Sequence, residues 1–354
     1  MIPILFDSTE TQFTSNGKGR LVDCVSCKVT EERNGIYECE FQYPINGRLY
    51  NELLQGGTIG VIHDDNHDIQ PFDIYTNTGD IDGTVTFHAH HISYRQTNIV
   101  VGHVTGWGAS GALANIVSES VNTNPFSYST DKTDVSIYYH PGGHQQIAFR
   151  SAKDYLMGQE YSILDVFGGE YKFDKFNVSL LNARGQDTGV TIRHGKNLTG
   201  IEWTLDRSEL YNAIAPFTFD GVGTAWLGGG DTIVTPTTPI YPIVPVVMDV
   251  SQMITEPWLE TVGGESKLKI YARQYLDTNR PWIPKVTISL DFVAMWQTKE
   301  YESVASIQQI QLCDTVSVYW TEMGIVAEKA KVTKTVFNVL TERLDQIEIG
   351  QPLR

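Results

Sequence analysis

Basic residues are scarce in this chain of 354 residues. Lys and Arg number 26 against 42 Asp and Glu, which gives a formal net charge of −16 at pH 7. A nucleic-acid-binding surface needs clustered Lys and Arg to displace counterions, and an anionic membrane attracts the same residues. The composition therefore argues against both partners. It suits a wall past which DNA moves without sticking, although composition alone does not establish such a wall.

Cysteine is also scarce, with 4 in the chain. Cys24 and Cys27 form a CxxC, while Cys39 and Cys313 stand alone. A ribbon-type zinc site needs a second pair at similar spacing, and a redox CxxC begins a helix, whereas residues 21–29 are strand-like. We therefore expect ordinary reduced thiols of a protein made in a cytosol.

Long apolar runs are missing as well. The N-terminal run at residues 2–6 is too short for a signal peptide and lacks a basic flank, and no stretch approaches the roughly 20 residues that span a bilayer. We expect a soluble protein with no export signal and no membrane anchor. At 41% hydrophobic residues, the chain can bury real cores, and its length suggests two or three domains.

Strand signals dominate the first third. The stretch VSCKVTEERNGIYECEFQYP predicts two strands joined by an Asn-Gly turn at residues 34–35. TIGVIHDDNHDIQPFDIYTN repeats this plan with a polar tip, and GTVTFHAHHISY places Val85, Phe87 and Ala89 on one strand face. Several short strands joined by polar turns predict a small barrel or sandwich over residues 1–98.

The middle third mixes helices and strands. One helical face is expected after Ser110, formed by Leu113, Ile116, Val117 and Val121. SAKDYLMG opens with a capping-box pattern of Ser151 and Asp154, and SILDVFGG predicts a helical turn ended by Gly168-Gly169.

A strongly alternating stretch, VTIRHGKNLTGIEWTLD, follows at residues 190–206. It predicts two strands with one buried face each, joined as a hairpin at residues 195–197. The apolar positions of the two strands are Val190, Ile192, Ile201, Trp203 and Leu205.

Gly, Pro and Thr are concentrated in residues 221–245, which predicts a loop or linker. ESKLKIYARQYL then predicts a helix near residues 265–276 with Leu268, Tyr271, Ala272 and Tyr275 on one side. KVTISLDFV and three later stretches predict strands. The sequence thus has β-rich first and last thirds around a mixed middle.

A GxGxxG pattern at residues 106–111 follows a strand-like stretch and opens a helix, with Asp131 at a suitable distance. No alternation of strands and helices follows, so a flexible entry into a helix is favoured over dinucleotide binding.

Histidines are the second candidate for chemistry. His88 and His90 share one side of a strand and could bind a metal with His63 or His67, in the ligand-rich HDDNHD at residues 63–68. The alternative, which we favour, is a solvated strand face and a hairpin tip. A further pair, His140 and His144, flanks Gly142-Gly143 and predicts a loop.

Hydrolytic motifs would be the third candidate for chemistry. HExxH, GxSxG and a Cys–His arrangement are all missing, and acid pairs such as Asp64-Asp65 fall in turns that do not fix two carboxylates at a working separation. The residues therefore predict no catalytic, cofactor-binding or metal site.

The stretch from Ser151 to Phe217 resembles the signature of a phage tail-hub family. Its members are tail-associated proteins of long-tailed phages and prophages, often called prophage endopeptidase tail or minor structural proteins. The matching features are Leu156-x-Gly158, Gly168-Gly169-Glu170, Arg184-Gly185-x-Asp187 and the run Arg193-His194-Gly195-Lys196-Asn197-Leu198. VTEERNGIYECEFQYP and FHAHHISYRQTN resemble strands of the family's first barrel, and the last three strands also match.

The chain departs from this family in three places. Cys313 stands before Asp314 where the family usually has Gly, and residues 221–245 look like an enlarged connection. The catalytic module of many relatives lies C-terminal to the matched region, so the name endopeptidase does not carry over and we expect no enzyme.

The resemblance implies a β-rich α+β fold with two similar tube-forming β-barrel domains, a mixed α/β domain between them and small peripheral elements. It places the first barrel at residues 1–98, completed by strands from about 196–220, and the mixed peripheral domain at 99–195. The connection is then 221–245, and the second barrel, with its helix, is 246–354.

The family also implies a mechanical role. Its members resemble the baseplate hub of contractile-tailed phages, in which three copies form a ring that caps the tail tube and DNA passes the lumen without specific binding. The implied partners are the distal tail and tail tube proteins, with the tape measure and receptor-binding proteins as further candidates. The implied location is the virion tail tip, after assembly in the host cytoplasm.

Two other functions stay open on the residues alone. One is a cell-wall peptidase or glycosidase hidden in the chain. The other is a carbohydrate- or receptor-binding module, for which Trp226 and Trp258 would supply stacking faces.

Overall fold

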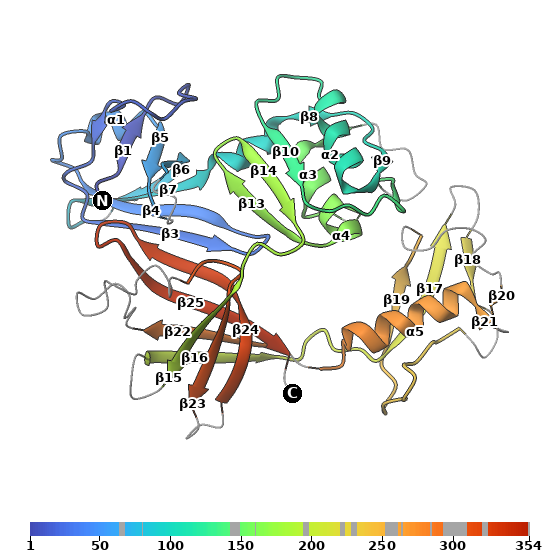
Figure 1. Ribbon diagram of the computed structural model, residues 1–354. Helices are drawn as coiled ribbons and strands as arrows, with labels where there is room; N and C mark the ends of the chain where they lie inside the picture. The colour runs from blue at the N-terminus through green and yellow to red at the C-terminus, as the bar shows by residue number, and fades with distance from the viewer. Residues whose placement is uncertain are drawn as a thin grey trace.

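The computed structural model divides the chain into two barrel-like sheets, a mixed middle domain and a smaller insert domain (Figure 1). It describes residues 1–63, 68–79, 81–141, 149–159, 161–193, 198–219, 224–227, 232–251, 261–262, 265–283, 285–292, 310–320 and 325–352.

A 13-stranded sheet runs through both barrels, in the order β16-β22-β25-β24-β3-β4-β7-β6-β5-β1-β2, with β23 paired to β24 and to β15. The first barrel holds β1 (Ile4–Phe6), β2 (Gly19–Arg20), β3 (Ser26–Glu32), β4 (Tyr37–Pro44), β5 (Thr58–Val61), β6 (Gln70–Gly79) and β7 (Thr84–His91), with α1 (Tyr50–Leu54) and the 3-10 helix η1 (Ile92–Asn98). The second barrel holds β15 (Asp187–Arg193), β16 (Leu198–Asp206), β22 (Lys285–Phe292), β23 (Thr315–Trp320), β24 (Ile325–Asn338) and β25 (Arg343–Pro352).

Alternation builds the first barrel as the sequence predicts. β3 and β4 pair across the turn in which Asn34 takes a positive φ of 55°, and β5 pairs with β6. Val85, Phe87 and Ala89 point inward from β7 and are buried with Phe41 and other apolar residues of this barrel. Each inward side chain of this size contributes about 1.5–3 kcal/mol by burial, which fixes the register of the strands.

The second barrel includes β15 and β16, whereas the sequence predicts residues 187–193 in the mixed domain and residues 196–220 in the first barrel. Residues 190–206 do form two strands, but they are not hairpin partners: β16 pairs with β22 antiparallel, and β15 pairs with β23 in parallel. The expectation that residues 196–220 complete the first barrel is therefore wrong. Ile192 and Ile201 instead pack on Leu290 in the core of the second barrel, which lies at the opposite end of the chain.

The middle domain packs three helices against short strands. Its elements are β8 (Val100–Val101), β9 (Gly106–Trp107), α2 (Gly108–Ser118), β10 (Ser127–Thr130), β11 (Tyr138–Tyr139), β12 (Arg150–Ser151), α3 (Ala152–Leu156), α4 (Ile163–Phe167), β13 (Glu170–Asp174) and β14 (Asn177–Leu181).

Helix ends in this domain follow the sequence signals in part. The Ser151 hydroxyl caps α3 by accepting from the backbone N–H of Asp154 at 3.1 Å. Leu113 and Ile116 of α2 are buried, whereas Val117 is exposed within the helix and Val121 is exposed beyond its end at Ser118. The predicted helical face was therefore one turn too long.

The insert domain lies between β16 and β22 in the sequence. It contains β17 (Ala213–Phe219), β18 (Thr224–Trp226), β19 (Pro245–Asp249), β20 (Thr261–Val262), β21 (Glu265–Ser266) and α5 (Lys267–Asn279). The expected helix is thus present, but it packs through Leu268, Ala272 and Leu276 on Ile214 of β17 and not on the second barrel. Figure 1 shows this unit in yellow and orange, set apart from the two barrels.

Candidate functional site

Antiparallel strands join the two barrels edge to edge. The last five residues of β24 pair with β3, from Lys334 opposite Glu32 to Asn338 opposite Lys28. Main-chain hydrogen bonds therefore continue from one barrel into the other, and the N–H of Arg33 extends the seam by donating to Thr333 at 2.8 Å. The two barrels behave as one sheet at this seam, because sliding them apart would expose backbone groups of both strands.

One face of this sheet carries mostly polar side chains across its width, with the apolar Val336 among them. Eight strands carry it, in the order β6-β7-β4-β3-β24-β25-β22-β16, all antiparallel. Directly opposed residues share a face, so the register defines its rows. One row runs through Thr76, His88, Glu40, Lys28 and Asn338, and another through Glu32, Lys334, Glu348, Ser289 and Glu202. We call this surface the polar sheet face.

Carboxylates outnumber basic groups along these rows and the row between them. The acids are Glu32, Glu38, Glu40, Glu202, Asp291 and Glu348, and the bases are Lys28, Lys334 and Arg343, the last of which lies opposite Asn338. Lys334 lies between Glu32 and Glu348, at 3.1 and 3.2 Å, and both carboxylates raise its pKa against the opposing effect of burial. The face keeps a negative excess, which repels other polyanions.

Aromatic rings stack at the β6 end of the polar sheet face. Tyr75 lies 3.7 Å from His90 ring to ring, and His90 lies 4.3 Å from Tyr94, both nearly parallel. The ammonium of Lys153, on α3, lies 3.4 Å from the Tyr94 ring centre, a cation–π contact that ties the middle domain to the first barrel. Burial lowers the pKa of His90, although Glu38 at 3.0 Å opposes this shift.

A buried ion pair holds the opposite side of the seam. Arg184, just after β14, donates to both carboxylate oxygens of Glu31 at 2.6 and 3.2 Å. Burial alone would lower the pKa of Arg184, but the charge and hydrogen bonds of Glu31 raise it overall. The fork geometry of guanidinium on carboxylate fixes the orientation of the middle domain on β3.

Glu170, the first residue of β13, completes this three-domain junction. Its carboxylate lies 2.5 Å from the ammonium of Lys331 on β24 and 3.6 Å from Arg33, and accepts from the backbone N–H of Arg184 at 2.8 Å. Burial raises the pKa of Glu170, but the bonds from Lys331 and Arg184 outweigh burial and lower it overall. One carboxylate thus contacts all three domains.

Glycines let the backbones meet at this junction. A Cβ at Gly185 would overlap the main chain of Cys313 and Asp314, and Gly169 has a φ of 107° with Leu181 O only 2.5 Å from a Cβ position. Asn34 bonds the residues on both sides of Glu170, since its amide NH2 donates to Gly169 O and its amide oxygen accepts from the Tyr171 N–H. The motifs Gly168-Gly169-Glu170 and Arg184-Gly185, which carry the tail-hub resemblance, therefore lie at the contact between domains.

The three glycines of GxGxxG have structural roles. A Cβ at Gly106 would lie 2.5 Å from the backbone of Gly111, and Gly108 has a φ of 67° against Asp134 O. Strand β9 holds the first two residues of the motif and pairs antiparallel with β11, so among the described residues no parallel sheet leads into this helix. Asp131 is occupied by the N–H of Asn182 at 2.7 Å. This geometry fits the helix-entry alternative and differs from the strand–turn–helix geometry of a dinucleotide-binding site.

The histidines do not converge. His88 and His90 lie on the polar sheet face beside Glu40 and Glu38. His63 lies behind that sheet, with its Nε2 3.0 Å from the Tyr37 hydroxyl in the aromatic core. Within the described ranges, no group of three His, Cys, Asp or Glu side chains could hold a metal ion.

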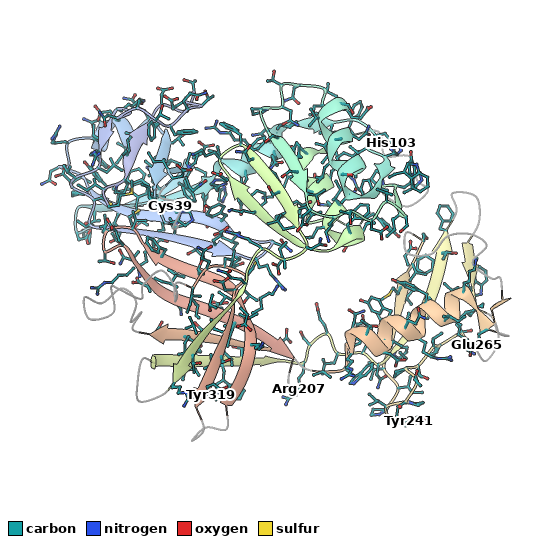
Figure 2. All side chains as sticks on the ribbon, in the orientation of Figure 1. Cys39, His103, Arg207, Tyr241, Glu265 and Tyr319 are labelled. Atoms are coloured by element: carbon teal, nitrogen blue, oxygen red, sulfur yellow. The ribbon has the colours of Figure 1, made fainter. Side chains whose placement is uncertain are left out.

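Three of the four cysteines lie close together, since Cys27 Sγ is 3.7 Å from Cys39 Sγ and also contacts Cys24. Cys24, Cys27, Cys39 and Cys313 are free thiols, and a hydrogen bond with Cys27 together with burial raises the pKa of Cys24. Trp226 is exposed on β18 of the insert domain, whose exposed Tyr241 is labelled in Figure 2. His67, Asp64, Asp65, His144, His194 and Trp258 fall outside the described residues, as does the predicted turn at 195–197. In the portion of the chain that is described, no helix is both long and apolar enough to cross a bilayer.

Sequence reasoning missed the junction and the polar sheet face. Glu31, Glu170 and Lys331 are far apart in the chain, and only pairing of β3 with β24 brings them together. A signal was present: charged residues alternate with apolar ones in both β3 and β24, which indicates a strand with one polar face.

Comparison with known proteins identifies the fold of the chain. No model of a protein family matches the chain, and no curated protein matches its sequence. Solved structures match over nearly its whole length. The prophage tail protein gp18 from Listeria monocytogenes EGD-e has a TM-score of 0.60 at 16% identity, covering 99% of this chain and 94% of that one.

Two further tail proteins have similar scores. The tail protein from Neisseria meningitidis MC58 gives a TM-score of 0.61 at 9% identity, with 95% of this chain and 94% of that chain covered. The 43 kDa tail protein of prophage MuSo2 from Shewanella oneidensis gives 0.55 at 13% identity, with 99% and 97% covered. The chain therefore has the fold of phage tail proteins, and the β-rich α+β resemblance drawn from its motifs is confirmed as a fold.

Proposed function

We propose that this protein is a structural hub of a phage or prophage tail. In this proposal three copies form a ring that caps the tail tube and connects it to the host-recognition apparatus. The observation that carries the proposal is the polar sheet face, which continues across two barrels in a chain with a tail-protein fold. A sheet of this kind that curves around a channel presents water-compatible side chains to the lumen and keeps its apolar cores outside.

The charge of this face supports a role in DNA passage. Genomic DNA that leaves through a tail must slide, and binding to Lys and Arg would arrest it by counterion release. The negative excess of the polar sheet face prevents such binding. Gating of that passage, and contacts with the distal tail, tail tube, tape measure and receptor-binding proteins, belong to the same proposal, as does a place in the virion after assembly in the host cytoplasm.

We propose further that the chain acts without catalysis. Its buried and half-buried charges are engaged in structural ion pairs: Glu31 and Glu170 each bind a cation from another domain at 2.6 Å or less, and Asp73 binds Arg95 within the first barrel at 2.6 Å. A zymogram on purified bacterial cell wall tests this part. No clearing is expected, and clearing that is lost on substitution of one acidic residue or histidine would establish the peptidase or glycosidase alternative. Binding on a glycan array, abolished by Trp226→Ala, would establish the carbohydrate-binding alternative.

Mass measurement in solution tests the ring. Light scattering of the purified full-length chain should give three times the 39.6 kDa of the protomer, and the trimer should co-migrate with tail tube or distal tail protein. A stable monomer that joins neither protein would overturn the proposal.

A further inference from the structure

We propose that Asn34 is a deamidation site that the middle domain protects, and that its conversion to a carboxylate irreversibly loosens the junction between the domains. The reaction consumes water and releases ammonia. The inference goes beyond the hub function and does not depend on it, because it concerns contacts within a single chain.

Asn34 precedes Gly35, and an Asn-Gly pair is the sequence in which an asparagine side chain cyclises most readily. The main-chain nitrogen of Gly35 attacks the side-chain carbonyl carbon of Asn34, its proton passes to the departing ammonia, and a succinimide forms. Glycine favours this step because no Cβ hinders its nitrogen. Water then opens the ring to aspartate or isoaspartate, so that a neutral amide becomes a carboxylate.

The docked middle domain holds this side chain at both of its polar atoms. The Asn34 amide NH2 donates to Gly169 O at 2.9 Å, and its amide oxygen accepts from the Tyr171 N–H at 2.8 Å. Cyclisation must turn the amide toward Gly35, which breaks both of these bonds. The Gly35 N–H must also leave the Glu32 carbonyl, to which it donates at 3.1 Å. Deamidation therefore requires the middle domain to leave the β3–β4 turn first.

Another Asn-Gly pair in the same barrel serves as an internal comparison. Asn46 and Gly47 follow β4, and the Gly47 N–H donates to Pro44 O at 2.9 Å, the same kind of bond that closes the Asn34 turn. The Asn46 side chain is exposed, whereas Asn34 is half-buried against the middle domain. Contact with another domain therefore distinguishes the two pairs.

A carboxylate at position 34 does not fit the docked arrangement. One of its oxygens would still accept from the Tyr171 N–H, but the other would face Gly169 O, where the amide now donates. Two acceptors at this distance repel each other, and the hydrogen bond between the two groups is lost. Isoaspartate would in addition lengthen the main chain of the turn by one methylene group. Docking at this point would therefore not be restored after conversion.

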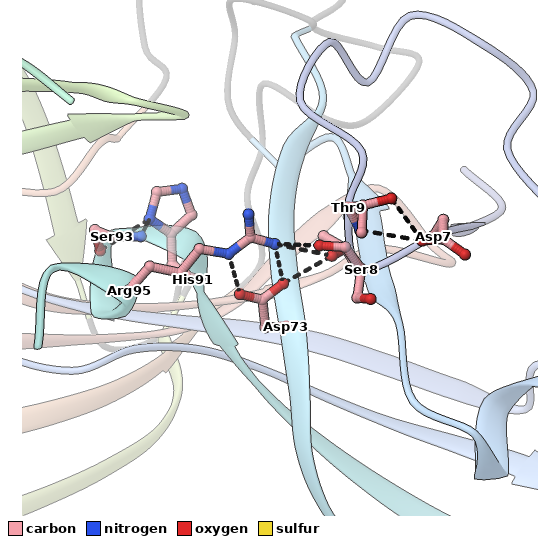
Figure 3. Close-up of polar contacts among 8 residues, drawn as sticks. Asp7, Ser8, Thr9, Asp73, His91, Ser93 and Arg95 are labelled. Carbon is pink, nitrogen blue, oxygen red and sulfur yellow. Dashed lines mark hydrogen bonds and ion pairs between the residues drawn. The ribbon is translucent and has the colours of Figure 1, made fainter. Parts of the chain in front are cut away.

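The middle domain would stay attached to the first barrel at a second point. η1 carries the chain from β7 toward the middle domain, and Arg95 of this helix donates to the Asp73 carboxylate at 2.6 and 2.7 Å (Figure 3). Arg95 also donates to the Ser8 carbonyl at 3.3 Å. These bonds fix η1 on β6 without involving Asn34. We therefore expect conversion to loosen the junction and to leave the first barrel folded.

Peptide mapping by mass spectrometry tests the protection. The full-length chain is incubated at mildly alkaline pH, and conversion of each Asn-Gly pair to aspartate or isoaspartate is followed with time. Asn34 should convert at least about tenfold more slowly than Asn46, because only molecules with an open junction react. In concentrated urea the two rates should agree within about twofold, since the fold no longer separates the two pairs. Equal rates in the native chain, or an unchanged ratio of rates in urea, would overturn the proposal.

Variants test the link to the junction. Arg184→Ala, which removes the buried ion pair, should raise the rate at Asn34 at least about tenfold and leave the rate at Asn46 unchanged. A native rate at Asn34 in this variant would overturn the proposal. Asn34→Asp introduces the product directly and should melt at a lower temperature than the native chain, whereas the matched variant Asn46→Asp should not. Equal melting temperatures of the two aspartate variants would overturn the loosening even if Arg184→Ala failed to fold.

Discussion

Arg184 donates two hydrogen bonds, of 2.6 and 3.2 Å, to the Glu31 carboxylate on the core side of the seam between the two barrels. The two residues are 153 positions apart, and their side chains are only 16% and 8% exposed. Because Glu31 lies on β3 and Arg184 leads from the middle domain into the second barrel, this pair links the three domains that the polar sheet face depends on.

Removal of one partner should therefore lower the free energy of unfolding far more than removal of both. Arg184→Ala leaves the buried carboxylate of Glu31 without its countercharge, and we expect a loss of about 3–5 kcal/mol in the free energy of unfolding. The double variant Arg184→Met with Glu31→Gln should recover much of this loss, because neither position then carries an unpaired buried charge. Urea denaturation measures both. A single variant that loses less than about 1 kcal/mol, the scale of an exposed pair, would contradict this account.

Backbone proximity at the junction predicts a second effect. Gly185→Ala should destabilise the chain by several kcal/mol, since the new methyl group would overlap the backbone of Cys313 and Asp314, which cannot rotate away. Gly79→Ala is the matched control, because its nearest neighbour would be Val85 Cγ2 at 3.8 Å. Thermal melting of the two proteins should separate them clearly, and equal melting temperatures would show that the approach at Gly185 is not tight.

Position 313 should prefer glycine over alanine. Cys313 has a φ of 72°, a left-handed conformation that costs a side-chain-bearing residue about 1 kcal/mol. This is the position at which the tail-hub resemblance expects Gly. Cys313→Gly should be as stable as Cys313→Ala or more stable by up to about 1 kcal/mol, the reverse of the usual order in a strand or helix. Chemical denaturation of the pair would refute the idea if alanine were clearly the more stable.

Acid should weaken the first barrel through its buried histidine. Burial, followed by nearby His63 and Arg95, holds the pKa of His91 well below its usual 6.5. The unfolded chain takes up a proton near pH 6.5 that the folded chain refuses, so the free energy of unfolding falls as pH drops below about 6.5. The slope is about 1.4 kcal/mol per pH unit for this group.

A substitution isolates this contribution. His91→Gln keeps hydrogen-bonding atoms beside Ser93 and Gln70 but does not titrate. Its stability, measured in urea between pH 7.5 and 5.5, should fall less steeply than that of the native chain. Identical slopes in the two proteins would mean that His91 is not the group responsible.

Local sequence patterns predicted individual helices and strands well, but they did not predict which strands pair with each other. The β3–β4 hairpin follows from the turn at Asn34 and strict alternation, and α3 follows from Ser151 and its cap. Whether β16 joins the first or the second barrel depends on pairing with β22, 79 or more positions away, which no local pattern encodes. The assumption that residues 190–206 form a hairpin failed for this reason.

The candidate site was only partly visible for the same reason. The conspicuous GxGxxG motif allows close packing of the backbone and is not part of the junction. Glu31 and Lys331, which are, look in the sequence like solvent-exposed charges on strand faces. The resemblance of the Gly169-Glu170 and Arg184-Gly185 motifs to a tail-hub signature identified the correct fold. Those residues hold the junction between domains, so the motif indicates how the domains pack together and does not indicate a catalytic site.

Imaging of single particles of the purified full-length protein tests the central claim most directly. We expect a ring with threefold symmetry whose central opening is walled by the polar sheet face of both barrels. Particles without threefold symmetry, or a ring in which that face points outward to solvent, would contradict it.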